Sequence, residues 1–238
     1  MEWWKEAFGP WYPIVYNTRD DLGALKEVES AARWLGLDRH HDVLDLACGG
    51  GRHARAMIPL VRSVVGCDLS RDLLRIAMSA GGGPRYVAAD QRALPFATSS
   101  FDAVACFFTS FGYGESVDHD KLIVEEVRRV IRRGGRFLLD LPHAEYVRSH
   151  LVPESSEARG LFVVKCSRRL VGNRVEKTVV VSEGGEIKST WRESVRLYDA
   201  AEVTTLIESL GFRTNSSHSS FNPVATSHDR HIVISEAT

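Results

Sequence analysis

A short apolar run that ends in a glycine turn constrains this chain more than any other feature. Val43-Leu44-Asp45-Leu46 leads into Ala47-Cys48-Gly49-Gly50-Gly51, and Arg52-His53-Ala54 begins a helical pattern. Glycine allows a tight turn and the close approach of a ligand, because it has no side chain in the way. The first turn of the following helix has unpaired N–H groups that favour a polar or anionic ligand. The segment therefore predicts a strand, a ligand-binding loop and a helix, in that order.

Apolar strands alternate with helices on both sides of this loop. We expect a helix at 22–37, then strands at 43–46, 63–67, 85–89, 101–108 and 136–141, with helices at 51–59, 70–80 and 117–132. Continuously apolar strands that alternate with helices are typical of a parallel sheet covered on both faces, which binds ligands at the carboxyl ends of its strands. Asp45, Asp68 and Asp90 each stand at such an end.

The pattern changes after Pro142. Apolar and polar residues alternate in three segments, 162–170, 174–182 and 187–197, which predicts antiparallel strands joined by turns at 172–173 and 184–185. We expect a helix at 199–210 and strands at 212–216 and 231–235 to follow. We expect an α/β fold with a doubly wound, mostly parallel, Rossmann-like sheet and a small antiparallel insertion after strand five. The predicted divisions are an N-terminal aromatic lid and helix (1–40), a cofactor-binding core (41–142), an antiparallel annex (143–198) and a final helix with strands (199–238).

Composition excludes several classes of partner. The 30 Lys and Arg against 31 Asp and Glu leave no basic footprint for nucleic acid or for an anionic membrane surface. Arg128, Arg129, Arg132 and Arg133 cluster at the end of an amphipathic helix, where cations suit the helix dipole, so we interpret them as a solvated face. The sequence shows neither a signal peptide nor a membrane span, and its four isolated cysteines indicate a reduced, cytoplasmic protein without a structural metal.

Two cofactors fit the glycine loop. Residues 49–54 satisfy the dinucleotide pattern G-x-G-x-x-G/A, with Asp68 placed to bind a ribose hydroxyl. Asp45 lies four residues before the first glycine, where its charge opposes a pyrophosphate but suits the ammonium of S-adenosylmethionine. Asp90 and Gln91 add polar groups beside the expected adenine. We therefore expect S-adenosylmethionine as cofactor, with S-adenosylhomocysteine as product, and keep a nicotinamide cofactor as the alternative.

Five motifs resemble, in order, those of the class I S-adenosylmethionine-dependent methyltransferases. They are residues 45–51 (D-x-[GA]-[CST]-G-x-G), 66–70, 89–91 with 94–96, 101–104 and 132–137, where Arg133 replaces the usual proline. The resemblance covers most of the chain and implies a seven-stranded sheet and methyl transfer. It also implies cofactor contacts from Asp45, Ala47, Cys48, Gly49, Gly51, Asp68, Leu69, Asp90, Gln91 and Phe107. Asp102 is instead expected to orient the start of its strand.

An aromatic segment precedes the first long helix. Trp4, Phe8, Trp11 and Tyr12 recur at helical spacing, which predicts either a staple on the core or a lid whose rings face the sulfonium. Residues 12–20 also resemble the Tyr-x-x-x-Tyr…Arg stretch of deoxysugar N-methyltransferases. That resemblance implies that Tyr16 and Arg19 hold the cofactor's carboxylate.

The acceptor side is less constrained. Methyl transfer requires alignment of the reactants, and a general base only when the acceptor must lose a proton. His143 directly follows strand five and is the predicted base, ahead of His119 at a solvated helix start. Expected acceptor contacts are Phe111, Tyr113, Tyr146, Arg196 and Tyr198. The annex forms either part of the acceptor site or a surface on which two copies pair.

The leading hypothesis is transfer of a methyl group to an oxygen or nitrogen of a small organic molecule. Phe107–Tyr113 is an aromatic lining suited to such an acceptor, and strand four is not followed by the Asn-Pro-Pro-Tyr or Asp-Pro-Pro-Tyr stretch of enzymes that methylate nucleobases or planar amides. The alternatives are a methyltransferase-like enzyme with another reaction such as cyclisation, a nicotinamide-dependent oxidoreductase, and a non-catalytic binding subunit.

Overall fold

The computed structural model describes residues 3–16, 20–108, 110–222, 224 and 228–238. Within these residues the strands form a seven-stranded sheet, ordered β10-β11-β5-β4-β1-β2-β3, and a separate four-stranded sheet, β6-β7-β8-β9. The predicted fold class is confirmed. No helix in the described ranges is long and apolar enough to span a membrane.

The large sheet is parallel from β3 to β5, and β11 pairs antiparallel with both β5 and the edge strand β10. Its strands are β1 (Asp42–Leu46), β2 (Ser63–Asp68), β3 (Arg85–Ala88), β4 (Phe101–Cys106), β5 (Ile131–Pro142), β10 (Phe212–His218) and β11 (Arg230–Ala237). Asp45 is paired with Gly66 in register and Asp68 with Ala88, so the carboxyl ends of β1, β2 and β3 lie side by side. This register brings the predicted strand-end acids to one edge of the sheet.

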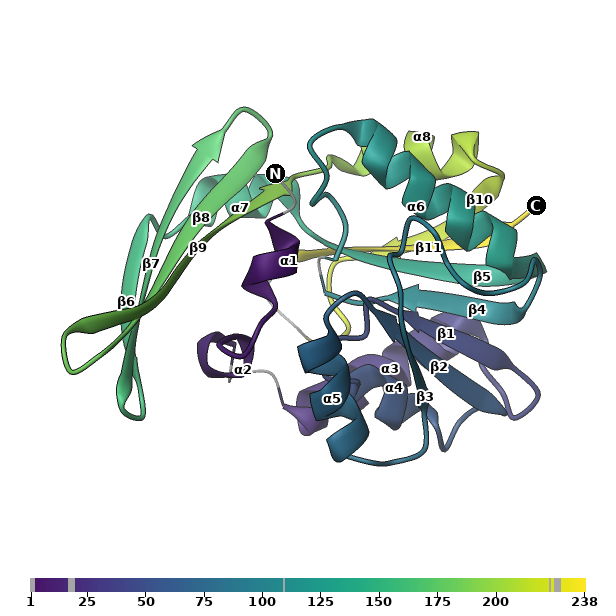
Figure 1. Cartoon of the computed structure of the whole chain (residues 1–238). Helices are drawn as coiled ribbons and strands as arrows, with labels where there is room; N and C mark the ends of the chain where they lie inside the picture. Colours follow the sequence, from purple (N-terminus) through teal and green to yellow (C-terminus); the bar gives the residue numbers. More distant parts are fainter. Residues whose placement is uncertain (1–2, 17–19, 109, 223, 225–227) are drawn as a thin grey trace.

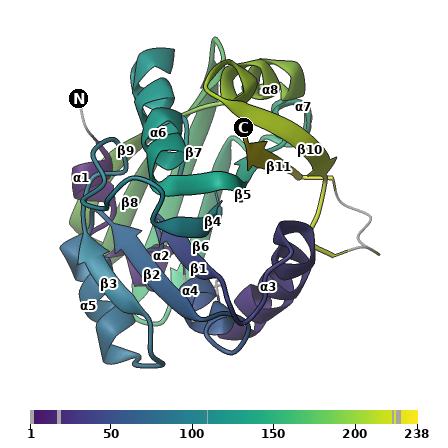
Figure 2. The same ribbon diagram turned by 90° about the vertical axis from the view of Figure 1, so that its right-hand side faces the viewer.

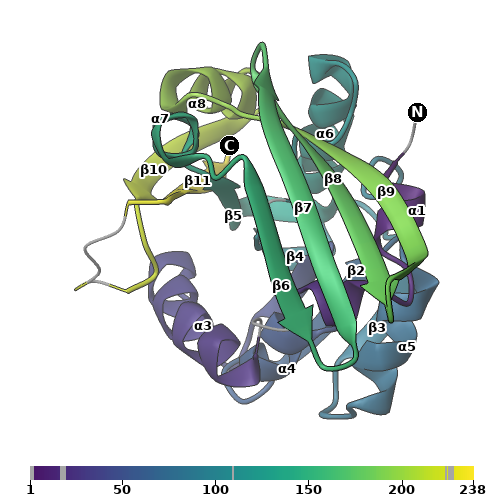
Figure 3. The same ribbon diagram turned by 90° about the vertical axis from the view of Figure 1, so that its left-hand side faces the viewer.

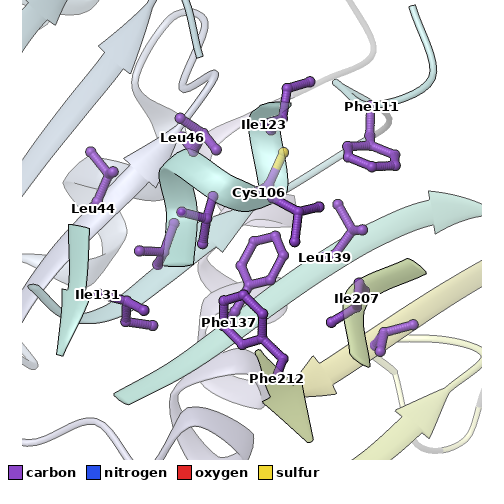
Figure 4. Close-up of a cluster of buried hydrophobic side chains, with 14 of the residues drawn as sticks. Leu44, Leu46, Cys106, Phe111, Ile123, Ile131, Phe137, Leu139, Ile207 and Phe212 are labelled. Carbon is purple, nitrogen blue, oxygen red and sulfur yellow. The ribbon is translucent and has the colours of Figure 1, made fainter. Parts of the chain in front are cut away.

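Helices cover both faces of this sheet (Figure 2). Buried residues of α3 (Asp21–Leu35) and α4 (Arg52–Met57) pack on one face, and those of α6 (Val117–Val130) and α8 (Ala200–Ser209) on the other. The helix starts follow from local sequence: the Asp20 carboxylate accepts from the Gly23 N–H before α3, and the Ser70 hydroxyl accepts from Leu73 before α5 (Arg71–Ser79). Figure 4 shows the core on the α6 and α8 side, where Phe111 lies among Ile123, Leu139 and other buried side chains.

The insertion is a twisted antiparallel sheet that stands apart from the large sheet (Figures 1 and 3). We call it the annex sheet, and it consists of β6 (Glu154–Arg159), β7 (Phe162–Val171), β8 (Arg174–Glu183) and β9 (Glu186–Arg196). The predicted turns at 172–173 and 184–185 are confirmed, with Gly172 and Gly184 in the left-handed region. Its first strand, β6, and the helix α7 (Ala144–His150) that precedes it were not predicted, because their sequences are too polar to show a period.

The N-terminal aromatic segment lies between the annex sheet and the core (Figure 1). It forms two short helices, α1 (Trp4–Ala7) and α2 (Tyr12–Val15), separated at Gly9-Pro10 as the sequence predicts, whereas Pro13 lies in the first turn of α2, where proline is tolerated. Ala7 and Val15 join Val164, Val179 and Trp191 of the annex sheet in a core of their own. The segment therefore docks on the annex sheet.

Asp102 has the structural role that the sequence indicates, whereas the arginine cluster differs from the predicted solvated face, because Arg128, Arg129 and Arg132 are half-buried and bonded to neighbouring segments. Asp102 accepts from the Asp42 N–H at 2.8 Å and pairs with Arg132 at 2.6 Å, which fixes the amino-terminal end of β4 against β1. Arg129 pairs with Glu126 and donates to the carbonyl of Phe96. The arginine cluster thus ties the end of α6 to its neighbours. One boundary differs from the prediction, since β5 already begins at Ile131, which pairs with Phe101 ahead of an irregularity in the register.

Candidate functional site

Two cavities lie at the carboxyl ends of β1, β2 and β3. The first, of about 460 Å³, extends over Asp68 and Asp90 toward the annex sheet, and the second, of about 450 Å³, follows the glycine loop and the start of α4. They share the wall residues Tyr12, Tyr16, Ala47, Gly49, Leu73, Phe108 and Ser110. Because the walls are common, the two cavities form one cleft between the large sheet, the N-terminal helices and the annex sheet.

The glycine loop is held open by left-handed backbone and by one carboxylate. Ala47, Gly49 and Gly51 have φ values of 56°, 53° and 72°. The Asp68 carboxylate accepts from the N–H groups of Gly49 and Ser70, both at 2.8 Å, and so joins the loop to the start of α5. Ala47 and Gly49 line both cavities, and their contacts with the cofactor stay a prediction.

Gly51 serves packing. A Cβ on Gly51 would lie 2.3 Å from the Tyr86 hydroxyl oxygen, so only glycine fits there. Among the described residues that line the cleft, Gly51 is absent, and the predicted contact with a cofactor is not supported by its position. The glycine is required because Tyr86 of β3 packs under the turn.

Asp45 is a buried acid whose hydrogen bonding is incomplete. Its side chain is 1% exposed and lines the second cavity, and its Oδ2 has no hydrogen-bond partner in the described part of the chain. Burial, followed by the nearby charge of Asp68, raises the pKa of Asp45 to about 8. A buried carboxylate oxygen without a donor costs stability, and a bound ammonium would supply the missing donor. The position thus fits the expectation for Asp45.

The far end of the first cavity is polar. Asp90 accepts from the Arg92 side chain at 2.6 Å, and the Gln91 amide donates to the Ser110 carbonyl at 2.9 Å. The Gln91 Oε1 is buried without a partner among the residues described. With Leu69 on the same wall, this end offers hydrogen-bonding groups beside an apolar surface, which suits a nucleobase.

Besides Asp45, two predicted cofactor contacts lie only at the second cavity. Cys48 and Phe107 both line it, and the Phe107 ring stacks on His53 with centroids 4.0 Å apart. His53 is buried and bonded to Glu27 at 2.6 Å. Phe107 therefore packs against the first turn of α4, which directly follows the glycine loop.

Tyr16 is bonded to the annex sheet. Its hydroxyl donates to Glu193 at 2.7 Å and accepts from the Lys177 ammonium at 2.6 Å. Trp191 Nε1 also donates to Glu193, at 2.9 Å. We call Tyr16, Lys177, Trp191 and Glu193 the latch. Tyr16 also lines both cavities, so its predicted contact with the cofactor's carboxylate stays a prediction, while the corresponding prediction for Arg19 lies outside the described residues.

An aromatic wall closes the first cavity. Tyr113 lies 4.8 Å from Trp3, 6.4 Å from Trp4 and 5.8 Å from Phe8 between ring centroids. The Ser70 hydroxyl donates to the Phe8 carbonyl at 2.6 Å, which joins this wall to the start of α5. Tyr113 is the one predicted acceptor residue that the structure brings to the described walls of the cleft.

The other predicted acceptor residues lie elsewhere. His143 caps α7, where its Nδ1 accepts from the Tyr146 N–H at 3.2 Å and its own N–H donates to the Asp229 carbonyl at 2.8 Å. It is absent from the described walls of both cavities because β5 pairs with β11 up to Pro142, which fixes the following residue beside β11. The other four residues also lie away from these walls. Phe111 is in the core, and the Tyr146 ring stacks on His150. The Tyr198 hydroxyl donates to Asp120 at 2.5 Å, and the Arg196 side chain lies over the Tyr198 ring and pairs with Glu202.

Sequence reasoning ranked His119 behind His143 and missed two residues of β9 that line the first cavity. His119, in the first turn of α6, lines the first cavity, and its buried Nδ1 has no partner within the described residues. Glu193 and Val195 line the same cavity from β9. Trp191, Glu193 and Val195 occupy alternate positions along β9, so all three side chains lie on one face of the strand. This spacing could have predicted that they lie together, but the sequence does not show which face of the strand turns toward the core.

Comparison with known proteins agrees with this geometry. Residues 43–135 match the family model described as a methyltransferase domain, and this match spans the glycine loop and the three strand-end acids. Residues 43–135 are therefore similar to a methyltransferase domain. The chain is 30% identical over 131 residues to an uncharacterized methyltransferase, YcgJ, of Bacillus subtilis, an alignment that covers 52% of this chain and 47% of that protein. The chain thus spans about half the length of that curated relative.

Solved structures extend the likeness of fold beyond the methyltransferase domain. An S-adenosylmethionine-dependent methyltransferase from Clostridium acetobutylicum matches with a TM-score of 0.79 over 95% of this chain and 96% of its own, at 18% identity. CalS10, an amino pentose methyltransferase from Micromonospora echinaspora solved with S-adenosylmethionine bound, matches with a TM-score of 0.71 over 95% and 96%, also at 18% identity. The chain has the fold of S-adenosylmethionine-dependent methyltransferases.

Proposed function

We propose that this chain transfers a methyl group from S-adenosylmethionine to an oxygen or nitrogen of a small organic molecule. The observation that carries the proposal is the row of acids along one cleft: Asp45, Asp68 and Asp90 end adjacent strands, and Asp45 has an oxygen that lacks a donor within the described structure. A cofactor with an ammonium, a ribose and an adenine matches these groups in that order.

The residues of the cleft fit this cofactor. Asp45 would pair with the ammonium, Asp68 would accept from the ribose hydroxyls, and Asp90 with Gln91 would contact the adenine beside Leu69. When bound, S-adenosylmethionine supplies a methyl group activated by a sulfonium. The chain's own task is to align the acceptor with this group and to exclude water, and such alignment is worth up to roughly 7–11 kcal/mol in model reactions.

The acceptor end of the cleft favours a small molecule. Trp3, Trp4, Phe8 and Tyr113 form an apolar wall, and Glu193 and His119 are the ionisable groups that face it from the annex sheet and from α6. We propose His119 as the group that accepts a proton from the acceptor, in place of His143. We further propose a cytoplasmic location, because the four cysteines are free and buried, and an acceptor that is neither nucleic acid nor lipid.

The cofactor is tested by calorimetric titration with S-adenosylhomocysteine and with NAD. We expect binding of the first only, and at least tenfold weaker binding by Asp68→Asn, because the carboxylate then loses its charge at the ribose. Asp118→Asn, an exposed acid on α6, serves as the control. Binding of NAD in place of S-adenosylhomocysteine would show an oxidoreductase.

The reaction is tested with a panel of small amines and hydroxyl compounds. After incubation with S-adenosylmethionine, mass spectrometry should find an acceptor heavier by one methylene unit. Addition at carbon would contradict the proposed acceptor atom, and a rearranged acceptor without added mass would indicate the cyclisation alternative.

The proton acceptor is tested by the pH dependence of the rate. If His119 takes the proton, His119→Asn lowers kcat by about 10²-fold, within the usual range for a lost general base, and removes one limb of the pH profile. His143→Asn should leave both unchanged. Equal effects of the two substitutions would rule out the assignment.

A further inference from the structure

Phe108 adopts a backbone conformation that aromatic residues rarely accept. Its φ is 56°, in the left-handed region, directly after β4. A side chain with a Cβ persists there only where the surroundings hold it. Phe108 lines both cavities, so its conformation affects the wall that the two cavities share.

A buried carboxylate fixes this backbone. The Phe108 N–H donates to Asp140 Oδ2 at 2.8 Å, and the Asp140 side chain, near the end of β5, is fully buried. Arg230, at the start of β11, binds the same carboxylate with its Nε, 2.7 Å from Oδ1, and with a terminal nitrogen on Oδ2. The planar guanidinium matches the carboxylate in this two-point geometry. Asp140 is thereby held in the position that accepts from Phe108.

The same guanidinium contacts the Phe108 ring. The Arg230 Cζ lies 4.6 Å from the ring centroid of Phe108 and 5.4 Å from that of Phe221. Arg230 also pairs with Glu27 of α3 at 3.6 Å, and Glu27 holds His53 at the start of α4. Both the backbone and the ring of Phe108 are thus constrained by one buried pair that lies behind the cleft wall.

We propose that Asp140 and Arg230 are positioning residues that hold Phe108 in its left-handed conformation and thereby set the affinity of the cleft for its cofactor. The inference rests on the proposed function in its choice of S-adenosylhomocysteine as the probe. Without Asp140, Phe108 relaxes to an ordinary negative φ, and its ring leaves the wall that the two cavities share.

Asp102 provides a matched control. It also accepts a backbone N–H at 2.8 Å and pairs with an arginine, but it lies at the opposite end of the sheet and, within the described structure, away from both cavities. We expect Asp140→Asn to weaken S-adenosylhomocysteine binding at least tenfold by calorimetry, and Asp102→Asn to change it less than twofold. Equal weakening by both, or wild-type affinity in Asp140→Asn, would overturn the proposal.

A more conservative variant tests the proposal if Asp140→Asn does not fold. Arg230→Lys keeps the charge but loses the planar two-point contact and the flat contact with the ring. We expect about fivefold weaker binding by this variant. Unchanged affinity would count against the pair.

A second readout does not depend on the cofactor. Phe108→Gly removes the cost of a positive φ, because glycine adopts that region freely. In the wild-type background, the relaxation of Phe108 offsets part of the stability lost in Asp140→Asn, whereas the Phe108→Gly variant has no strain to relieve. We therefore expect Asp140→Asn to lower the urea midpoint by more in the Phe108→Gly background than in the wild type. An equal fall in the two backgrounds would show that Asp140 does not hold Phe108 in its left-handed conformation. If the wild-type chain does not bind S-adenosylhomocysteine, the proposed function fails. The urea experiments with the single and double variants still decide whether Asp140 acts on Phe108.

Discussion

At the scale of single residues, Asp45 combines a structural cost with the ammonium-binding role that we propose for it. It is buried beside the glycine loop with an oxygen that lacks a donor among the described residues, and burial raises its pKa to about 8. A group whose pKa is higher in the folded state than in the unfolded chain binds its proton more tightly when folded. The free energy of unfolding of the cofactor-free protein therefore falls as the pH rises from about 4 to about 8, by up to about 1.4 kcal/mol per pH unit from this group.

Asp45→Asn should remove this part of the pH dependence. Thermal unfolding between pH 5 and pH 8 should show a smaller loss of Tm with rising pH in the variant, whereas the exposed control Asp118→Asn should follow the wild type. Because an ammonium favours the ionised carboxylate, cofactor binding near pH 7 should release a proton from Asp45. The binding enthalpy should then depend on the ionisation enthalpy of the buffer in the wild type, and less so in Asp45→Asn. The same dependence in both proteins would contradict this role.

The strand-end acids could be predicted from the sequence, but the acceptor residues could not. Asp45, Asp68 and Asp90 follow apolar strands, and parallel strands bring their carboxyl ends to one edge. His143 also follows a strand, but β11 pairs with β5 as far as Pro142 and holds His143 away from the cleft. The antiparallel partner strand β11 lies some 90 residues further along the chain, so the residues near His143 do not predict this pairing. His119 was disfavoured because a helix start looks solvated until the folded neighbours are known.

At the scale of elements, the latch connects α2 to the annex sheet. Glu193 is the common acceptor for Tyr16 and Trp191, and it pairs with Lys177 at 3.4 Å. A hydrogen bond to a charged group contributes about 1.5–3 kcal/mol, which is large for a helix of four residues that cannot form alone. The position of α2 over the cleft therefore depends on the annex sheet.

Glu193→Gln should loosen α2 without unfolding the domain. We expect amide hydrogen exchange in residues 12–16 to become about tenfold faster or more, with little change in the core strands. Glu176→Gln is the matched control, since Glu176 lies on the neighbouring strand β8 and pairs with the exposed Arg169 of β7. If exchange in residues 12–16 is the same in both variants, the latch does not hold α2.

At the scale of the whole molecule, one arginine joins the annex sheet to the loop after β4. Arg174 of β8 donates to the carbonyls of Gly112, Tyr113 and Gly114 and to the carbonyl of Ser194. These contacts position Tyr113 against the N-terminal aromatic rings. The apolar core of the annex sheet is separate from the two cores of the large sheet, so polar contacts of this kind carry much of the coupling between the two sheets.

Arg174→Ala should lower the free energy of unfolding by about 2–3 kcal/mol, because several charge-assisted hydrogen bonds are lost and their carbonyls stay partly buried. Urea denaturation followed by tryptophan fluorescence measures this change, since Trp191 reports on the annex sheet. Arg192→Ala, an exposed residue on β9, should change the stability by less than about 0.5 kcal/mol. Equal effects of the two substitutions would show that Arg174 does not couple the sheets.

The match to the methyltransferase domain ends at residue 135, before the annex sheet begins. Glu193 and Val195, which face the acceptor end, are carried by hairpins whose turns at Gly172 and Gly184 have open space around them. The sequence and length of these turns can therefore diverge while the loop at Asp45 and its neighbouring strands stay the same. Arg174, Lys177 and Glu193 contact the loop after β4 and α2, so an exchange of the annex sheet has to retain these three residues.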